Sequence, residues 1–328
     1  ALRFNIITGN SPGNDTRFYV ERCEAMRNFA NKLWNASRFV MMNLSVNDCA
    51  LPGTLELPDK WVLSKFNSLV GEVRENLDKY ELGIAAQKIY DFIWDTYCDW
   101  YIELAKARLN GDDAEAREGA ERVLLYVLTG ILKLLHPFMP FITEEIYQAL
   151  PHECEALIIA PYPKYDPALS FPAEEQSFEL VMDAIRAIRS RRADMNVPPS
   201  RKAKVIVATG EQATFVSGAP YMQRLASASE VEVVDAGYEA APGMVTVTTH
   251  SARLLMPMAE LVDLEAERAR LTKELEKARK QLEAQEKKLA NESFVSRAPE
   301  AVVNAERERA EKAKALIANL EGSLKELG

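Results

Sequence analysis

The end of the chain repeats apolar residues at a spacing that is typical of long amphipathic helices. Leucines and alanines recur every three or four positions from Leu261 to Leu289, and the spacing resumes from Val303 to Leu327. A break that contains Pro299 separates the two stretches. Because each stretch has one narrow apolar seam, we predict an antiparallel coiled-coil hairpin over 263–328, with arms roughly 40 Å long. An arm of that length suits contact with a large partner.

The first 150 residues are also helical by their apolar period. Five helices are predicted, with Asp59 as the N-cap of the second: Arg17–Leu44, Asp59–Lys79, Glu81–Leu109, Ala114–Leu135 and Ile142–Leu150. Their short connections favour an antiparallel bundle, which with a proline-rich linker would occupy 17–170.

A small α+β domain is predicted over 171–262. Its elements are two helices and three short strands rich in β-branched residues: Glu174–Met195, Lys204–Thr209, Gln212–Ala226, Glu230–Asp235 and Met244–Thr249. The fold class is therefore mainly α, with a helical bundle, this small domain and the hairpin.

Charge and cysteine content limit the class of protein. The net charge of −9 by itself argues against a nucleic-acid-binding protein. Its distribution is uneven, however, because residues 1–47 carry six Lys/Arg against three Asp/Glu, on a body that is acidic over 48–170. We expect no DNA partner. No apolar run is long enough for a membrane span. None of the four cysteines, Cys23, Cys49, Cys98 and Cys154, forms a C-x-x-C pair, so we expect no metal site and reduced thiols in a cytoplasmic protein.

The first long helix has two unlike faces on a helical wheel. The predicted core face carries Phe18, Tyr19, Cys23, Met26, Phe29, Ala30, Leu33, Trp34, Val40, Met41 and Leu44. Phe39 lies instead on the polar face, with Lys32, Asn35 and Arg38. An exposed ring among amides and cations is what an unpaired RNA base needs for stacking, edge reading and phosphate contact. The alternative is that Phe39 turns inward and packs as a core residue.

Five strings of this sequence resemble valyl-tRNA synthetases, which are class I aminoacyl-tRNA synthetases. They are ALRFNIITGNSPGND (1–15), NFANKLWNASRFVMMNL (28–44), FIWDTYCDWYIELAK (92–106), HPFMPFITEEIY (136–147) and LANESFVSRAPEAVVNAERER (289–309). The third and fourth strings resemble motifs that valyl enzymes share with isoleucyl and leucyl enzymes. The family's nucleotide-binding fold, its HIGH and KMSKS signatures and its editing domain have no counterpart here. The resemblance therefore implies a C-terminal fragment without an active site, with residues 1–16 as the connector from the catalytic domain.

The resemblance also implies the partners and the site residues. Anticodon contacts are expected at Lys32, Asn35, Arg38 and Phe39. Contacts with the outer corner of tRNA are expected on the arm, at Lys280, Lys287, Lys288 and Arg307. The expected partners are valine tRNA and the missing catalytic and editing domains, with no membrane. No cofactor is expected in this chain, which should be a monomer; ATP and Mg²⁺ belong to the parent enzyme.

Two other identities stay open at this point. One is the equivalent region of an isoleucyl or leucyl enzyme, although the scattered cysteines cannot build the zinc module that is typical of isoleucyl enzymes. The other is a non-enzymatic coiled-coil protein whose arm recruits protein partners.

Three further groups have structural and functional interpretations. The acidic repeat Asp91, Asp95, Asp99 and Glu103 is predicted to be a solvated face rather than a metal site. The basic cluster between Arg186 and Lys204 fits either phosphate contact or docking on the acidic bundle. His136, before Pro137, is predicted to be a core or interface histidine rather than a catalytic one.

Overall fold

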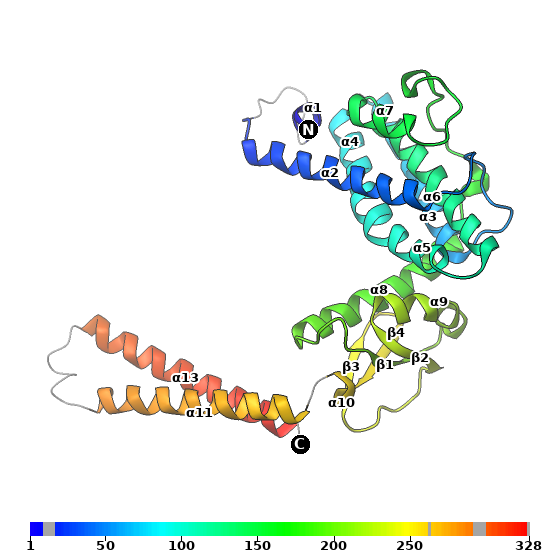
Figure 1. The fold of residues 1–328 in the computed structure, drawn as a ribbon. Helices are drawn as coiled ribbons and strands as arrows, with labels where there is room; N and C mark the ends of the chain where they lie inside the picture. The colour runs from blue at the N-terminus through cyan, green and yellow to red at the C-terminus, as the bar shows by residue number, and fades with distance from the viewer. Residues whose placement is uncertain (9–16, 262–263, 291–299, 327–328) are drawn as a thin grey trace. The chain divides into compact units, whose positions relative to one another are not determined.

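The computed structural model describes residues 1–8, 17–261, 264–290 and 300–326 (Figure 1). Contacts divide the chain into two compact units, residues 1–185 with 213–221, and residues 186–212 with 222–328. The predicted division at residue 171 stays a prediction. The compact units instead divide the helix α8 (Pro172–Asp194) after Ile185, because its first part packs on the bundle. Trp61 and Phe178, for example, place their ring centroids 5.6 Å apart.

The first unit is a helical bundle, as predicted. Its helices are α1 (Leu2–Ile7), α2 (Val20–Asn43), α3 (Leu57–Asp78), α4 (Leu82–Asp91), η1 (Phe92–Tyr101), α5 (Ile102–Leu109), α6 (Ala114–Leu135) and α7 (Pro140–Gln148). The single helix predicted over 81–109 is three consecutive segments, and η1 in the middle is a π-helix. Short 3-10 turns at Leu157–Ile159 and Pro167–Leu169 interrupt the linker that follows α7.

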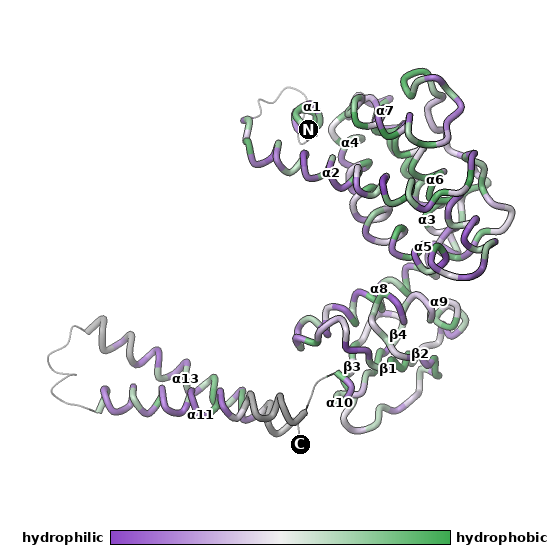
Figure 2. Tube along the Cα trace, viewed as in Figure 1, coloured by the Kyte–Doolittle hydropathy of each residue, from purple (hydrophilic) through white to green (hydrophobic). Residues whose placement is uncertain are grey.

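The core of this unit lies between α3, η1 and α6. Figure 2 shows the hydrophobic colour gathered on α6, whose buried residues include most of its length from Gly119 to Leu135. No helix in the described ranges is both long enough and apolar enough to cross a bilayer. Asp113 caps α6 by accepting hydrogen bonds from the backbone N–H groups of Glu115 and Ala116.

The predicted N-cap of α3 is wrong by one turn. The N-cap is Glu56, and Asp59 is the third residue of the helix, where its carboxylate accepts from the Glu56 backbone N–H at 3.0 Å. The two side chains form a reciprocal capping box around Pro58. Asp59 is fully buried because it also binds α5, as shown below.

Residues at the start of the chain pack as part of the bundle. Phe4 of α1 is buried and stacks on Phe29 of α2, with ring centroids 5.4 Å apart. Between α6 and α7, the His136 Nδ1 atom lies 2.8 Å from the Thr143 hydroxyl. Burial lowers the pKa of His136, so the ring is held neutral in a structural hydrogen bond.

The second unit contains a mixed four-stranded sheet in the order β2-β1-β4-β3. Its strands are β1 (Ala203–Thr209), β2 (Ala228–Asp235), β3 (Met244–Thr248) and β4 (Ala252–Pro257). β1 pairs parallel with β2, and the helix α9 (Gln212–Leu225) lies between the two strands in the sequence. β1 also pairs antiparallel with β4. The sequence analysis missed β4, which pairs with both β1 and β3 and so joins β3 to the parallel pair of β1 and β2.

The arm consists of two antiparallel helices, as the spacing predicts. After the short α10 (Met258–Leu261), α11 (Leu264–Leu289) packs along α13 (Glu300–Glu326), and Figure 2 shows the hydrophilic colour dominating both. Leu275, Ala278 and Leu320 form a buried cluster in the seam, with Ile317 against it. The predicted seam positions Leu264, Leu271, Val303, Leu324 and Leu327 lie outside the side chains that the structure describes.

Candidate functional site

The buried face of α2 is narrower than the wheel predicted. Only Phe29, Leu33, Ala36, Ser37 and Val40 are buried in this helix. Three residues assigned to the core face are exposed instead: Phe18, Tyr19 and Trp34. On ideal helix geometry Trp34 lies about 115° from the centre of the buried stripe, too far round to reach the core.

Phe39 lies about 100° from the centre of the same stripe, on the other side of α2. Its ring is half-buried, so it is neither the fully exposed plate nor the core residue that the sequence analysis considered. The Lys106 ammonium of α5 lies 5.3 Å from the ring centroid, within the range of a cation–π contact. One side of the ring therefore meets the bundle, and the rest faces an open groove.

This groove runs between α2 and the η1–α5 helix and has a volume of about 500 Å³. We call it the α2 groove. Its lining consists of one aromatic ring, three asparagines, two lysines and three smaller or apolar side chains: Phe39, Asn28, Asn31, Asn35, Lys32, Lys106, Ala36, Cys98 and Ile102. Amide edges, ammonium groups and one aromatic ring are the side chains that bind single-stranded RNA.

The π-helix η1 holds Lys32 in place. The Lys32 Nζ atom lies 2.7 Å from the Asp99 carboxylate, 3.3 Å from the Trp94 carbonyl oxygen and 3.8 Å from the Trp94 ring centroid. Its ammonium is thus fixed in the lining of the groove by three contacts with two residues of η1. Short π segments occur often at functional sites, and here the segment supplies both the carbonyl and the ring.

The acidic repeat supplies counter-charges to this groove. Asp99 pairs with Lys32, and Glu103 pairs with Lys106 at 2.5 Å. Within the described ranges, no group of three or more acidic, histidine or cysteine side chains could hold a metal ion. Both acidic partners are partly exposed, so a phosphate can compete with them for the two ammonium groups.

The other predicted anticodon residues lie at the groove or near it. Asn35 is exposed in its lining, and Arg38 is exposed on α2 with no ion pair to any residue that the structure describes. The wall opposite contains Cys98, whose pKa burial raises to about 12, so it presents a neutral thiol. Sequence reasoning missed Lys106 and Trp94, although both lie in the quoted string over 92–106.

The predicted arm residues are all exposed. Lys287 pairs with Glu283 at 2.6 Å, whereas Lys280, Lys288 and Arg307 have no ion pair among the described residues. The hairpin is cross-linked elsewhere, by Arg279 and Glu321 at 2.5 Å.

Three cations of the basic cluster between Arg186 and Lys204 bind other residues of the second unit. Arg192 is buried and donates to the carbonyl oxygens of Pro198 and Arg201, and Arg201 donates to the Glu260 carbonyl oxygen at 2.7 Å. Lys204 lies 2.8 Å from Glu232. These three cations therefore stabilise the turn and the sheet, which neither interpretation of the cluster anticipated.

Two family descriptions match this chain. Residues 59–207 match "Anticodon-binding domain of tRNA ligase", and residues 263–328 match "Valyl tRNA synthetase tRNA binding arm". A curated valine–tRNA ligase of Clostridium perfringens is 51% identical over 97% of the chain, and those of Clostridium acetobutylicum and Geobacillus stearothermophilus are 48% and 42% identical over 98%.

The chain belongs to the valyl-tRNA synthetase family. It spans 37–38% of the length of these curated relatives. The match to the valyl arm separates it from the isoleucyl and leucyl alternatives. Because α2 lies before residue 59, the α2 side of the groove falls outside both matched ranges, whereas Cys98, Ile102 and Lys106 lie within the first. The assignment of the groove residues stays a prediction.

Solved structures add a weaker likeness. A LeuRS chain from Agrobacterium radiobacter K84, in a ternary complex with tRNA and LeuAMS, has a TM-score of 0.42 and 15% identity, covering 52% of this chain and 20% of that one.

Proposed function

We propose that this chain recognises valine tRNA for a valine–tRNA ligase, with the α2 groove as the anticodon site and the arm as a second contact. The supporting observation is the composition of the α2 groove. It occurs on a chain in which residues 59–207 and 263–328 match an anticodon-binding family and a tRNA-binding family. Activation of valine with ATP and Mg²⁺ is proposed for the part of the relatives that this chain does not span.

In this proposal Phe39 stacks on an unpaired anticodon base with the side that faces the groove. Lys106 covers part of the ring and orients it, while Lys32 and Arg38 bind phosphate. The three asparagine amides can each donate and accept, as the reading of a base edge requires. Asp99 and Glu103 pair with the lysines until the RNA phosphates replace them.

A Phe39→Ala variant tests this assignment. Base stacking is worth about 1–3 kcal/mol, so we expect tRNA binding about 5- to 150-fold weaker by filter binding. The melting temperature should change little, because the ring is only half-buried. A fully buried Phe29→Ala variant should instead lose about 3–5 kcal/mol of stability.

Phe141 offers the matched control, since its ring is 87% exposed on α7 and does not line the groove. Phe141→Ala should leave tRNA affinity unchanged. Equal affinities for Phe39→Ala and the unaltered chain would remove Phe39 from the site, and no tRNA binding by the unaltered chain would favour a protein-binding role for the arm.

A further inference from the structure

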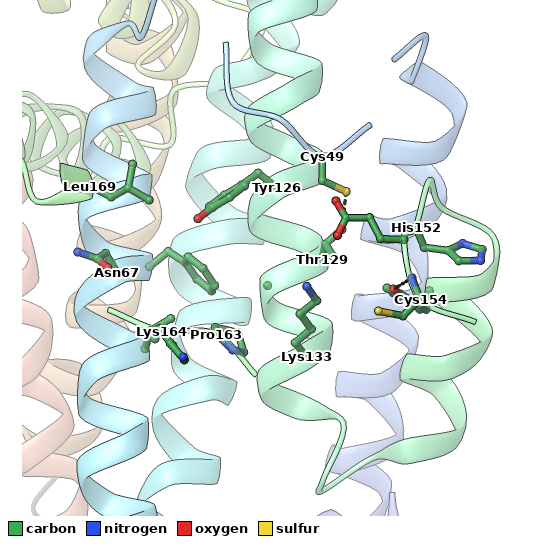
Figure 3. A pocket seen from close by; sticks show the side chains of 15 residues that line it. Cys49, Asn67, Tyr126, Thr129, Lys133, His152, Cys154, Pro163, Lys164 and Leu169 are labelled. Carbon is green, nitrogen blue, oxygen red and sulfur yellow. Dashed lines mark hydrogen bonds between the residues drawn. The ribbon is translucent and has the colours of Figure 1, made fainter. Parts of the chain in front are cut away.

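A second pocket lies within the first unit, away from the α2 groove. It has a volume of about 250 Å³ and lies between α3 and α6, under the linker that follows α7 (Figure 3). Figure 3 shows Tyr126, Thr129 and Lys133 along one side of α6, Asn67 on α3, and Lys164 and Leu169 on the linker. We call this the linker pocket.

The linker is tied down over the pocket by specific hydrogen bonds. The Asn67 side chain both donates to the Asp166 carbonyl oxygen and accepts from the Asp166 backbone N–H, each at 2.8 Å. Farther along, the Phe171 N–H donates to the Ser64 hydroxyl at 3.1 Å. The cover of the pocket is therefore fixed to α3 rather than resting loosely on it.

Gly130 also shapes the pocket. A Cβ atom at this position would lie 2.2 Å from the nearest atom of the Phe66 ring, which is closer than atoms can pack. The glycine thus lets the tip of the Phe66 ring reach the backbone of α6, where the ring forms an apolar wall of the pocket. Tyr126 adds a second aromatic wall, with its ring centroid 6.4 Å from that of Phe66.

Lysine pairing singles out this pocket. The first unit has eight lysines, and six of them form ion pairs: Lys32, Lys60, Lys65, Lys79, Lys88 and Lys106. The other two, Lys133 and Lys164, have no ion pair to any described residue, and both line the linker pocket. In a bundle with a large excess of acids, two unpaired ammonium groups in one pocket are available for an anionic ligand.

We propose that the linker pocket binds a mononucleotide-sized anion, with its phosphate at Lys133 and Lys164 and its flat ring against Phe66 and Tyr126. The lining carries one carboxylate, Glu153, against the two ammonium groups, so its charge favours an anion. The Tyr126 hydroxyl has no hydrogen bond to a described residue and can donate to the ligand. A pocket of this size admits one nucleotide, free or from a bound RNA, but not a stacked run.

Isothermal titration of the full chain with AMP, adenosine and inorganic phosphate tests the proposal. We expect saturable AMP binding, with adenosine at least about tenfold weaker because it lacks the charge. Lys133→Met should weaken AMP binding about tenfold or more, and Lys133→Arg should restore most of it. Lys79→Met is the matched control: it removes an exposed lysine outside the pocket and should leave AMP affinity unchanged.

Three results would overturn the proposal. The first is the absence of saturable AMP binding by a folded chain, the second is an equal loss for Lys133→Met and Lys79→Met, and the third is a loss of AMP binding in a Phe39→Ala variant. A Phe39→Ala variant must keep AMP binding, since a loss there would place AMP in the α2 groove. If tRNA displaces AMP, the natural ligand is a nucleotide of the RNA. If tRNA does not displace AMP, the natural ligand is a free nucleotide. Either outcome supports the linker pocket as a binding site.

Discussion

An Asp59→Ala variant is expected to lose about 3–5 kcal/mol of bundle stability, as much as truncation of the buried Phe29 ring. The Asp59 carboxylate is fully buried and accepts from the Tyr101 hydroxyl at 2.6 Å. It also binds both terminal nitrogens of Arg108, one of them at 2.7 Å. Removing the carboxylate leaves a guanidinium that is only 11% exposed without its main partner.

The pKa values agree with this arrangement. Burial alone would lower the pKa of Arg108, but the hydrogen bond to Asp59 and the nearby negative groups raise it overall. Burial, reinforced by the Asp59 charge, raises the pKa of Tyr101 well above its usual value. The Tyr101 hydroxyl and the Arg108 guanidinium therefore keep their protons and remain donors to Asp59.

Tryptophan fluorescence during urea unfolding measures this loss for the bundle alone, because all four tryptophans lie between residues 34 and 100. Glu75→Ala, which removes half of an exposed ion pair with Lys79, should barely change the transition. An Asp59→Leu, Arg108→Met double variant should recover part of the stability. A loss below about 1 kcal/mol for Asp59→Ala would show that the network does not hold α3 to α5.

Neutralising the arm should have the largest effect on tRNA binding. We expect substitution by glutamine at four exposed positions to weaken binding on the order of ten- to a hundredfold at low salt and to flatten the dependence of log K on log salt by about 3. The positions are Lys280, Lys287, Lys288 and Arg307. Phosphate contacts release counter-ions, so their loss must appear in the slope.

Deleting residues 263–328 should produce the same change in slope while the bundle stays folded, since the arm packs along its own seam. Glutamine at Lys273, Lys277, Lys312 and Lys314 is a control of equal charge on the same helices. An unchanged slope after deletion would mean that the arm serves a protein partner. Equal effects of the two glutamine sets would mean that the arm acts through its overall charge rather than through the four predicted residues.

Helix periods predicted the architecture well and the local geometry less well. The bounds of α6 match the prediction at both ends, since Asp113 and His136 flank an unbroken apolar period. The π-helix η1 was not predictable, because its residues have the same period as an α-helix and only packing selects the wider turn. β4 (ARLLMP) was missed because the short apolar run LLMP does not alternate between apolar and polar residues.

The candidate site was predicted in part. The wheel separated Phe39 from the core residues of α2, but it could not place Lys106 over the ring, because that contact depends on how α5 packs beside α2. The wheel also assigned Trp34 to the core face, but this residue is exposed. A wheel predicts which side of a helix is apolar, but not how much of that side contacts the rest of the bundle. The pairing of Lys32 with Asp99, 67 positions later, depends on the same packing.

Competition among tRNAs tests the central claim most directly. Labelled valine tRNA is bound to the full chain and displaced by unlabelled valine, isoleucine or leucine tRNA, at two salt concentrations. We predict salt-sensitive binding in which valine tRNA competes at least about tenfold better than the other two, because anticodon contacts distinguish them. Equal competition by all three tRNAs, or binding that salt does not weaken, would contradict recognition through the α2 groove and the arm.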